Sequence, residues 1–152
     1  MDLGIYCIQA SRYCTGEEPL AAVASTEKTD EVKFADVEET VRWQLEFPSG
    51  IITTSMCSYN LQANRLKLTA EKGWLELRSA FSYNGISGRT NDGKIEFPFV
   101  NQQALQMDGF SRCILDQLPS DADGEEGLKD MRVIEAIYKS VQTGTKAAVR
   151  ED

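Results

Sequence analysis

The chain has 152 residues, of which 41% are hydrophobic and 26% charged, and its net charge is −8. This composition is that of a folded domain with its own core, and the acidity disfavours nucleic acid or an anionic membrane as a partner. No apolar run is long enough to cross a membrane and no secretion signal is visible, so we expect a cytoplasmic protein.

The residue types that are absent exclude several kinds of catalysis. There is no histidine, which excludes a Cys–His pair and a Ser–His–Asp triad. The four cysteines, Cys7, Cys14, Cys57 and Cys113, contain no C-x-x-C pair. We therefore expect reduced thiols and no metal site. The glycine cluster Gly85–Gly88 matches neither a P-loop nor G-x-G-x-x-G, so no cofactor-binding residues are expected in this chain.

Residues 2–14 have the apolar spacing of a helix, and Gly16 is a suitable cap for its C-terminus. A domain seldom begins with an apolar helix already in its first turn. We therefore expect the sequence to be part of a longer protein.

Alternation of apolar and polar residues predicts strands over most of the next eighty residues. It is clearest in residues 37–47, where Val37, Val41, Trp43, Leu45 and Phe47 share one face. Further strands are expected at 20–26, 51–59, 65–69, 73–78 and 94–99. Asn84-Gly85 and Asp92-Gly93 are typical of hairpin turns.

Helical spacing returns at 102–118 and 125–143, and a last edge strand is expected at 146–150. The expected apolar stripe of the final helix consists of Leu128, Met131, Ile134, Tyr138 and Val141. The whole chain, 1–152, is interpreted as one α+β domain with an open, mainly antiparallel sheet. Helices are expected to pack on one face, while the other, polar face is exposed or forms an oligomer interface.

Asp2 and Tyr6 are four residues apart on the first predicted helix, so their side chains share a face and form a candidate acid/base pair. A tyrosine base needs a nearby cation to favour the phenolate, and no lysine is close in sequence. The alternative is structural: Asp2 would suit the helix dipole and Tyr6 would pack in the core. Gln9 and Arg12 lie near the same face as candidate substrate ligands, with a salt bridge as the alternative for Arg12.

Several stretches together resemble one known domain. They are Asp2–Ile8, Arg12-Tyr13, Gly16–Pro19, the hairpin Phe47–Gly50, the strand entry Glu71–Leu77 and the last helix, Glu125–Ser140. The chain resembles, over essentially its whole length, the C-terminal domain of the glucose–fructose oxidoreductase, inositol dehydrogenase and MocA family. The most similar branch includes glucose–fructose oxidoreductase and dihydrodiol dehydrogenase.

The resemblance implies a two-domain oxidoreductase acting on a CH–OH group of a sugar, polyol or dihydrodiol. An N-terminal Rossmann domain, absent from this sequence, would hold NAD or NADP and provide a catalytic lysine. Asp2 and Tyr6 match the substrate-side motif D-x-G-x-Y. The resemblance also implies a homo-oligomer formed through the sheet face and a domain that is inactive alone. The alternatives are a non-enzymatic oligomerisation domain and a small-molecule-binding domain.

Overall fold

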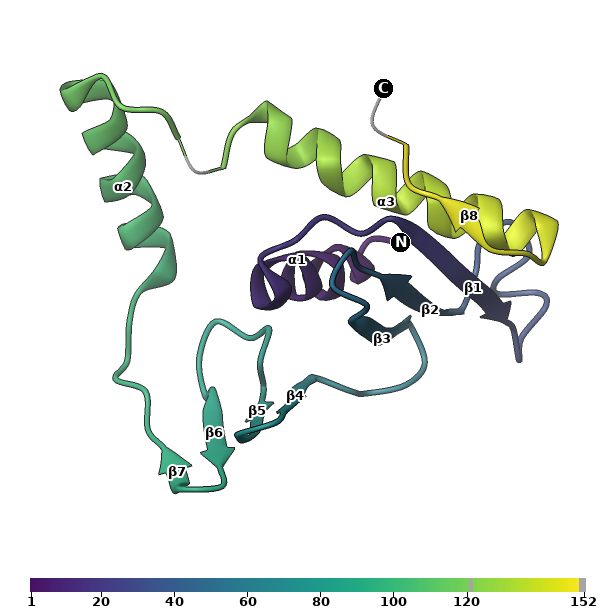
Figure 1. Cartoon of the computed structure of the whole chain (residues 1–152), viewed down its shortest axis with the longest axis horizontal. Coiled ribbons are helices and arrows are strands. Elements are labelled where there is room, and N and C mark those ends of the chain that lie inside the picture. The colour runs from purple at the N-terminus through teal and green to yellow at the C-terminus, as the bar shows by residue number, and fades with distance from the viewer. Residues whose placement is uncertain (121, 151–152) are drawn as a thin grey trace. The chain divides into compact units, whose positions relative to one another are not determined.

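The computed structural model describes residues 1–120 and 122–150. Within the predicted α+β fold the chain forms two compact units (Figure 1). Unit 1 combines Met1–Gln62 with Ala122–Asp152, and unit 2 is Ala63–Asp121. Two four-stranded antiparallel sheets replace the single sheet expected from the sequence, one in each unit.

Unit 1 contains two helices and a sheet with strand order β3-β2-β1-β8. Its elements are α1 (Gly4–Thr15), β1 (Ala21–Glu27), β2 (Thr40–Glu46), β3 (Ile52–Ser58), α3 (Gly124–Thr143) and β8 (Ala147–Ala148). The chain enters from α1 into β1, and α3 returns the chain to the free edge of β1 through β8. The predicted α+β class with antiparallel pairing is confirmed.

The core of unit 1 is formed by one face of the sheet and by α1 and α3, as the sequence predicts. Val41, Trp43 and Leu45 of β2 are buried, and Ile8 of α1 and Ile137 of α3 pack in the same cluster. The alternation in β2 is therefore confirmed, with one exception. Val37 precedes the strand and is 52% exposed.

Gly16 and Gly144 end α1 and α3 in the left-handed conformation, with φ of 68° and 67°. This conformation favours glycine, which lacks the Cβ that would clash there. At the start of α3 the Asp123 side chain accepts a hydrogen bond from the Glu126 N–H. Local residue chemistry thus sets these three helix ends close to their predicted positions.

The stripe predicted for α3 is partly wrong. Ile134 packs against the core and Tyr138 and Val141 are half-buried, but Leu128 and Met131 are exposed. The fully buried face consists of Asp130, Val133, Ala136, Ile137 and Ser140, and the apolar pattern missed it because Asp130 and Ser140 are polar. Each of them has hydrogen-bond partners there, which offset the cost of burying a polar group.

Unit 2 contains a sheet with strand order β4-β5-β6-β7 and one helix. Its elements are β4 (Arg65–Ala70), β5 (Gly73–Arg78), β6 (Ser87–Thr90), β7 (Gly93–Ile95) and α2 (Gln102–Asp116). Strand β6 was not predicted, because its sequence SGRT has little β propensity. The strand expected at 94–99 stops at Ile95, and Pro98 has no N–H to donate to a ladder beyond it.

Helix α2 occurs where it was predicted, but none of its residues is buried. Its spaced apolar residues Met107, Phe110 and Ile114 are all exposed. No helix in the described part of the chain is both long and apolar enough to cross a membrane.

Ser140 joins three elements of unit 1 through a single hydroxyl group. Its Oγ accepts a hydrogen bond from the Ala24 N–H of β1 at 2.9 Å and donates one to the Thr145 carbonyl at 2.7 Å. The side chain is 1% exposed, so water does not replace a lost partner easily.

We predict that Ser140→Ala lowers the free energy of unfolding by about 2 kcal/mol, since it leaves a buried N–H and a carbonyl unsatisfied. Urea unfolding followed by circular dichroism measures this. Ser25→Ala is the matched control, because Ser25 is an exposed residue of β1 in the same unit; its effect should stay below about 0.5 kcal/mol. Equal effects of the two substitutions would contradict this role of Ser140.

Candidate active site

Helix α1 has two faces with different tasks. Gly4, Ile8, Ser11 and Arg12 are buried against the rest of unit 1. The opposite side is exposed and includes Tyr6, Gln9 and Tyr13, which are spaced three and four residues apart. Asp2, which precedes the helix, is exposed too. Both predicted catalytic residues are therefore accessible.

Asp2 lies in the turn that precedes α1, rather than in the first turn of the helix as predicted. The Gly4 N–H donates to the Met1 carbonyl at 3.1 Å, which closes that turn. Tyr6 is 48% exposed, so the structural alternative of a core tyrosine does not hold. A carboxylate and a phenol are thus presented on the outer side of one helical end.

Gly4, between the two candidate residues, allows α1 to approach β3 closely. A Cβ at this position would lie 3.2 Å from Cys57 Sγ and 2.2 Å from Met1 Sδ. One turn later, burial raises the pKa of Cys7 to about 11, with Cys57 as a further cause. The Cys7 thiol is therefore protonated at neutral pH, which disfavours a nucleophilic role next to Tyr6.

The central electrostatic feature of this helix is the Arg12 cluster, which we define as Arg12, Glu18, Glu126, Lys129 and Asp130. Arg12 is 8% exposed and Asp130 is 1% exposed. The guanidinium donates from Nε to Glu18 at 2.6 Å and from Nη1 to Asp130 at 2.8 Å. Its Nη2 reaches Glu18 at 2.7 Å and Glu126 at 2.8 Å. Every guanidinium nitrogen thus has a carboxylate partner.

Gln9 is connected to the same cluster. Its Nε2 donates to Asp130 Oδ2 at 2.8 Å, while Arg12 uses Asp130 Oδ1. Both oxygens of this buried carboxylate are thereby satisfied. The substrate role of Gln9 and Arg12 stays a prediction. Gln9 donates to Asp130 of α3, and Arg12 donates to Glu18 and to two carboxylates of α3, which matches the salt-bridge alternative for Arg12.

Two carboxylates of the cluster, Glu18 and Glu126, are held in the charged form. The hydrogen bond from Arg12 lowers the pKa of Glu18. Lys129, and after it Arg12, lowers the pKa of Glu126. Because these pKa values are lower in the folded state, the cluster stabilises the fold above the ordinary carboxyl range, and this contribution is lost as the pH falls through it.

A second contact, between Glu38 and Tyr138, lies beside Asp2, and sequence reasoning missed it. Tyr138 donates to Glu38, although 100 residues separate them. Burial, followed by the hydrogen bond to Glu38, raises the pKa of Tyr138, so its phenol is protonated at neutral pH. Two residues this far apart give no local sequence signal.

A small hollow adjoins Asp2, lined among others by Leu3, Glu38, Ser58 and Tyr59. Its volume is about 10 Å³, room for about one water molecule. A sugar does not fit into this hollow. A substrate bound at Asp2 and Tyr6 would therefore need further contacts from residues outside this hollow.

The glycine cluster considered for nucleotide binding lies in unit 2. Gly85 is in the connection that leads into β6 and Gly88 is within that strand, which pairs with β5 and β7. A phosphate cradle requires a glycine-rich turn that passes from a strand directly into a helix. These glycines instead connect two strands, so they do not fit the phosphates of NAD or NADP.

We predict that Arg12→Met lowers the free energy of unfolding by about 3 kcal/mol or more, because Asp130 is left buried without its cation. Arg42→Met is the matched control: Arg42 pairs with Glu27 at 3.7 Å and both are half-exposed, so the loss should stay below about 1 kcal/mol.

The same variants test the pH dependence. The stability of the wild-type chain should fall as the pH decreases below about 4.3, and this decline should be smaller in Arg12→Met than in Arg42→Met. Thermal unfolding between pH 3 and pH 7 measures both slopes. Parallel slopes would show that the cluster does not control acid stability.

Known proteins resemble this chain over different parts of its length. A sequence profile described as the GFO/IDH/MocA C-terminal domain matches residues 1–76. D-xylose 1-dehydrogenase (NADP(+)) of Haloarcula marismortui is 28% identical, covering 100% of this chain and 43% of the relative. D-xylose 1-dehydrogenase (NADP(+)) 2 of Haloferax volcanii is 26% identical, covering 100% of this chain and 47% of that protein. The chain thus spans less than half the length of these two curated relatives.

Solved structures show the same similarity in three dimensions. The aldose-aldose oxidoreductase from Caulobacter crescentus, complexed with glycerol, matches 95% of this chain and 45% of its own with a TM-score of 0.89 and 38% identity. The myo-inositol 2-dehydrogenase from Lactobacillus plantarum matches 96% of this chain and 47% of its own with a TM-score of 0.72. At 19% identity, the second likeness supports the fold alone.

The profile covers half of the chain and includes α1 with Asp2 and Tyr6, and the fold agrees with that of related solved structures. The chain therefore belongs to the GFO/IDH/MocA family of oxidoreductases and contains the family's C-terminal domain.

Proposed function

We propose that this domain provides the substrate-side acid/base groups of an NAD(P)-dependent oxidoreductase acting on a CH–OH group. The observation that carries the proposal is the exposure of Asp2, just before α1, and of Tyr6, within α1, in the segment that matches the family profile. The curated relatives are named as D-xylose dehydrogenases that use NADP(+).

In the proposed oxidation Tyr6, as phenolate, takes the proton of the substrate hydroxyl group while the carbon becomes a carbonyl. Asp2 accepts a hydrogen bond from a neighbouring hydroxyl and orients the sugar. Both roles require contact with solvent or substrate, which the exposed side of α1 provides. The nicotinamide supplies the hydride chemistry.

The proposal assigns the cofactor to a Rossmann domain, either NAD or NADP, together with the lysine that favours the Tyr6 phenolate. Two observations support this division. The hollow next to Asp2 is too small for a sugar, and this chain covers less than half of each D-xylose dehydrogenase. We therefore expect the domain to be inactive without its Rossmann partner.

The proposed substrate class is a sugar or polyol, with a dihydrodiol as the remaining expectation from the family branch. Xylose, aldose and inositol in the names of the relatives and solved structures are all polyhydroxylated. Such molecules offer one hydroxyl for oxidation and another for a carboxylate such as Asp2.

We also propose a cytoplasmic location. All four cysteines are free thiols, two of them half-buried in unit 1, Cys7 and Cys57. Reduced thiols persist in compartments kept reducing by cellular thiols.

We predict that Tyr6→Phe, in the enzyme that joins this chain to its Rossmann domain, lowers kcat for an aldose by about 100-fold or more. This is the size of effect expected when a general base is lost. KM should change far less. The matched control is Tyr13→Phe, because Tyr13 lies on the same side of α1 and is 90% exposed. Unchanged turnover in Tyr6→Phe would remove Tyr6 from the mechanism.

We further propose that the outer face of the unit 1 sheet forms a homo-oligomer interface. The strand register places a mixture of apolar and polar residues on this face. They include Val23 of β1, Gln44 of β2, and Ile52 and Thr54 of β3. Exposed apolar residues rimmed by polar ones are typical of protein interfaces.

We predict that Ile52→Arg shifts the protein to a smaller assembly in sedimentation velocity. Ile52 is exposed on this face, so a buried arginine would cost interface energy without disturbing the core. Val32→Arg is the control, since Val32 is 90% exposed in the loop between β1 and β2. A sedimentation coefficient unchanged in Ile52→Arg would place the interface elsewhere.

A further inference from the structure

The sheet of unit 2 has one apolar and one charged face. Leu66, Leu77, Gly88 and Ile95 are neighbours on the apolar face. A Cβ on Gly88 would lie 3.0 Å from a Leu77 methyl group and 3.2 Å from Ile95 Cβ, so this face is tightly filled. The opposite face therefore carries the polar side chains of all four strands.

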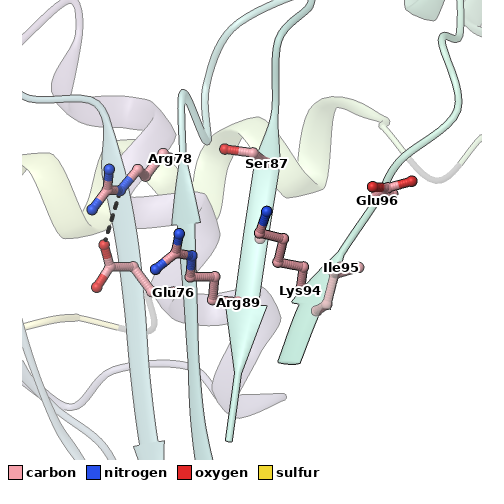
Figure 2. A pocket seen from close by; sticks show the side chains of 8 residues that line it. Glu76, Arg78, Ser87, Arg89, Lys94, Ile95 and Glu96 are labelled. Carbon is pink, nitrogen blue, oxygen red and sulfur yellow. Dashed lines mark hydrogen bonds and ion pairs between the residues drawn. The ribbon is translucent and has the colours of Figure 1, made fainter. Parts of the chain in front are cut away.

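Two rows of charge cross this second face. In one row Lys67, Glu76, Arg89 and Lys94 are aligned on the four strands, and Figure 2 shows the last three side by side. In the other row Arg65, Arg78 and Ser87 are aligned. The rows thus hold five basic side chains and one acidic one, in a chain whose net charge is −8.

Two pairs in these rows place like charges directly opposite each other: Arg65 faces Arg78, and Arg89 faces Lys94. Like charges in register on neighbouring strands destabilise a sheet. Glu76 has its ion pair with Arg78, at 3.4 Å. Within the described residues of this unit, Arg89 and Lys94 have no carboxylate within salt-bridge distance. The register also places Glu76 opposite both Lys67 and Arg89, so the unfavourable contacts are those within the two like-charge pairs.

The cations surround a hollow in the sheet face with a volume of about 290 Å³. It is lined by side chains from three strands: Glu76 and Arg78 of β5, Ser87 and Arg89 of β6, and Lys94 of β7, with Glu96 at its margin (Figure 2). Two guanidinium groups and an ammonium group thus border one space. Arginine donates in a fork that fits phosphate and carboxylate oxygens, and lysine adds a point charge.

From this arrangement we propose that the hollow on β5, β6 and β7 binds a small anion with two or more negative charges. Such an anion offsets the repulsion between Arg89 and Lys94 and gives Lys94 a counter-charge, since its register partner is Arg89. The site is distinct from Asp2 and Tyr6, and it does not depend on the proposed oxidoreductase function. Phosphate groups and di- or tricarboxylates share the required chemistry.

The test uses the 152-residue chain with sodium phosphate, sodium citrate and, at matched ionic strength, sodium chloride. We expect phosphate or citrate, but not chloride, to shift the amide NMR signals of β5, β6 and β7 in a saturable way. The two probes separate a phosphate ligand from a carboxylate ligand. Anions that bind only the native state also raise the melting temperature.

Two variants at the same position test the site. Arg89→Gln should weaken anion binding at least tenfold. Arg89 faces Lys94 on one strand and Glu76 on the other, so this substitution removes one repulsive and one attractive pair and should change the melting temperature of the anion-free chain by less than about 1 °C. Arg89→Lys should keep most of the binding. Lys67→Gln is the matched control: Lys67 is on the same face but does not line the hollow, so binding should change less than twofold.

Three results would overturn the proposal. The first is that phosphate and citrate cause no shifts beyond those of chloride. The second is that Lys67→Gln and Arg89→Gln weaken binding equally, which indicates diffuse screening. The third is that the signals of β5 to β7 depend on protein concentration and not on the anion, which identifies a second copy of the chain as the occupant.

Discussion

The arrangement of unit 1 depends on the burial of one ion pair, Arg12 with Asp130. A carboxylate that is 1% exposed needs its cation and its hydrogen bonds, or it would not remain charged in the interior. Arg12 and Gln9 satisfy both Asp130 oxygens and thereby join α1 to α3. Together with the packing of Ile8 in the core, this contact sets which side of α1 is buried, and Tyr6 lies on the exposed side.

The sequence allowed good prediction where the cause of a structure is local. Alternation in β2 and the glycines that end α1 and α3 act within a few residues, and these features are confirmed. The buried face of α3 was predicted only in part, because Asp130 and Ser140 enter the core with partners that lie more than 100 residues away. The spacing of apolar residues cannot reveal a buried polar residue whose hydrogen-bond partner is distant in sequence. Strand β6 was missed for a related reason, since its neighbours rather than its own residues hold it in the sheet.

The candidate site shows the same division. The helical position of Tyr6 could be predicted from local spacing, whereas Asp2 lies in the turn before α1 and not on the same helical face as predicted. The residues packed behind α1 could not be predicted, because the Arg12 cluster is formed by side chains from α1, from the segment that follows it and from α3. Sequence reasoning placed Arg12 among possible substrate ligands, whereas its three nitrogens all contact carboxylates of its own unit.

Helix α1 consequently has a buried side that stabilises unit 1 and an exposed side that bears Tyr6, the proposed general base. On the buried side, Ile8 is constrained by packing in the core. Arg12 is constrained by its ion pair with Asp130, because a change in either partner would leave the other as a buried charge without compensation. Gln9, although exposed, donates to the buried Asp130 carboxylate, so it belongs with Arg12 to the contacts that stabilise the fold. Under the proposed function, the position of Tyr6 depends on the packing of Ile8 and on the ion pair of Arg12 with Asp130, on the other side of the helix.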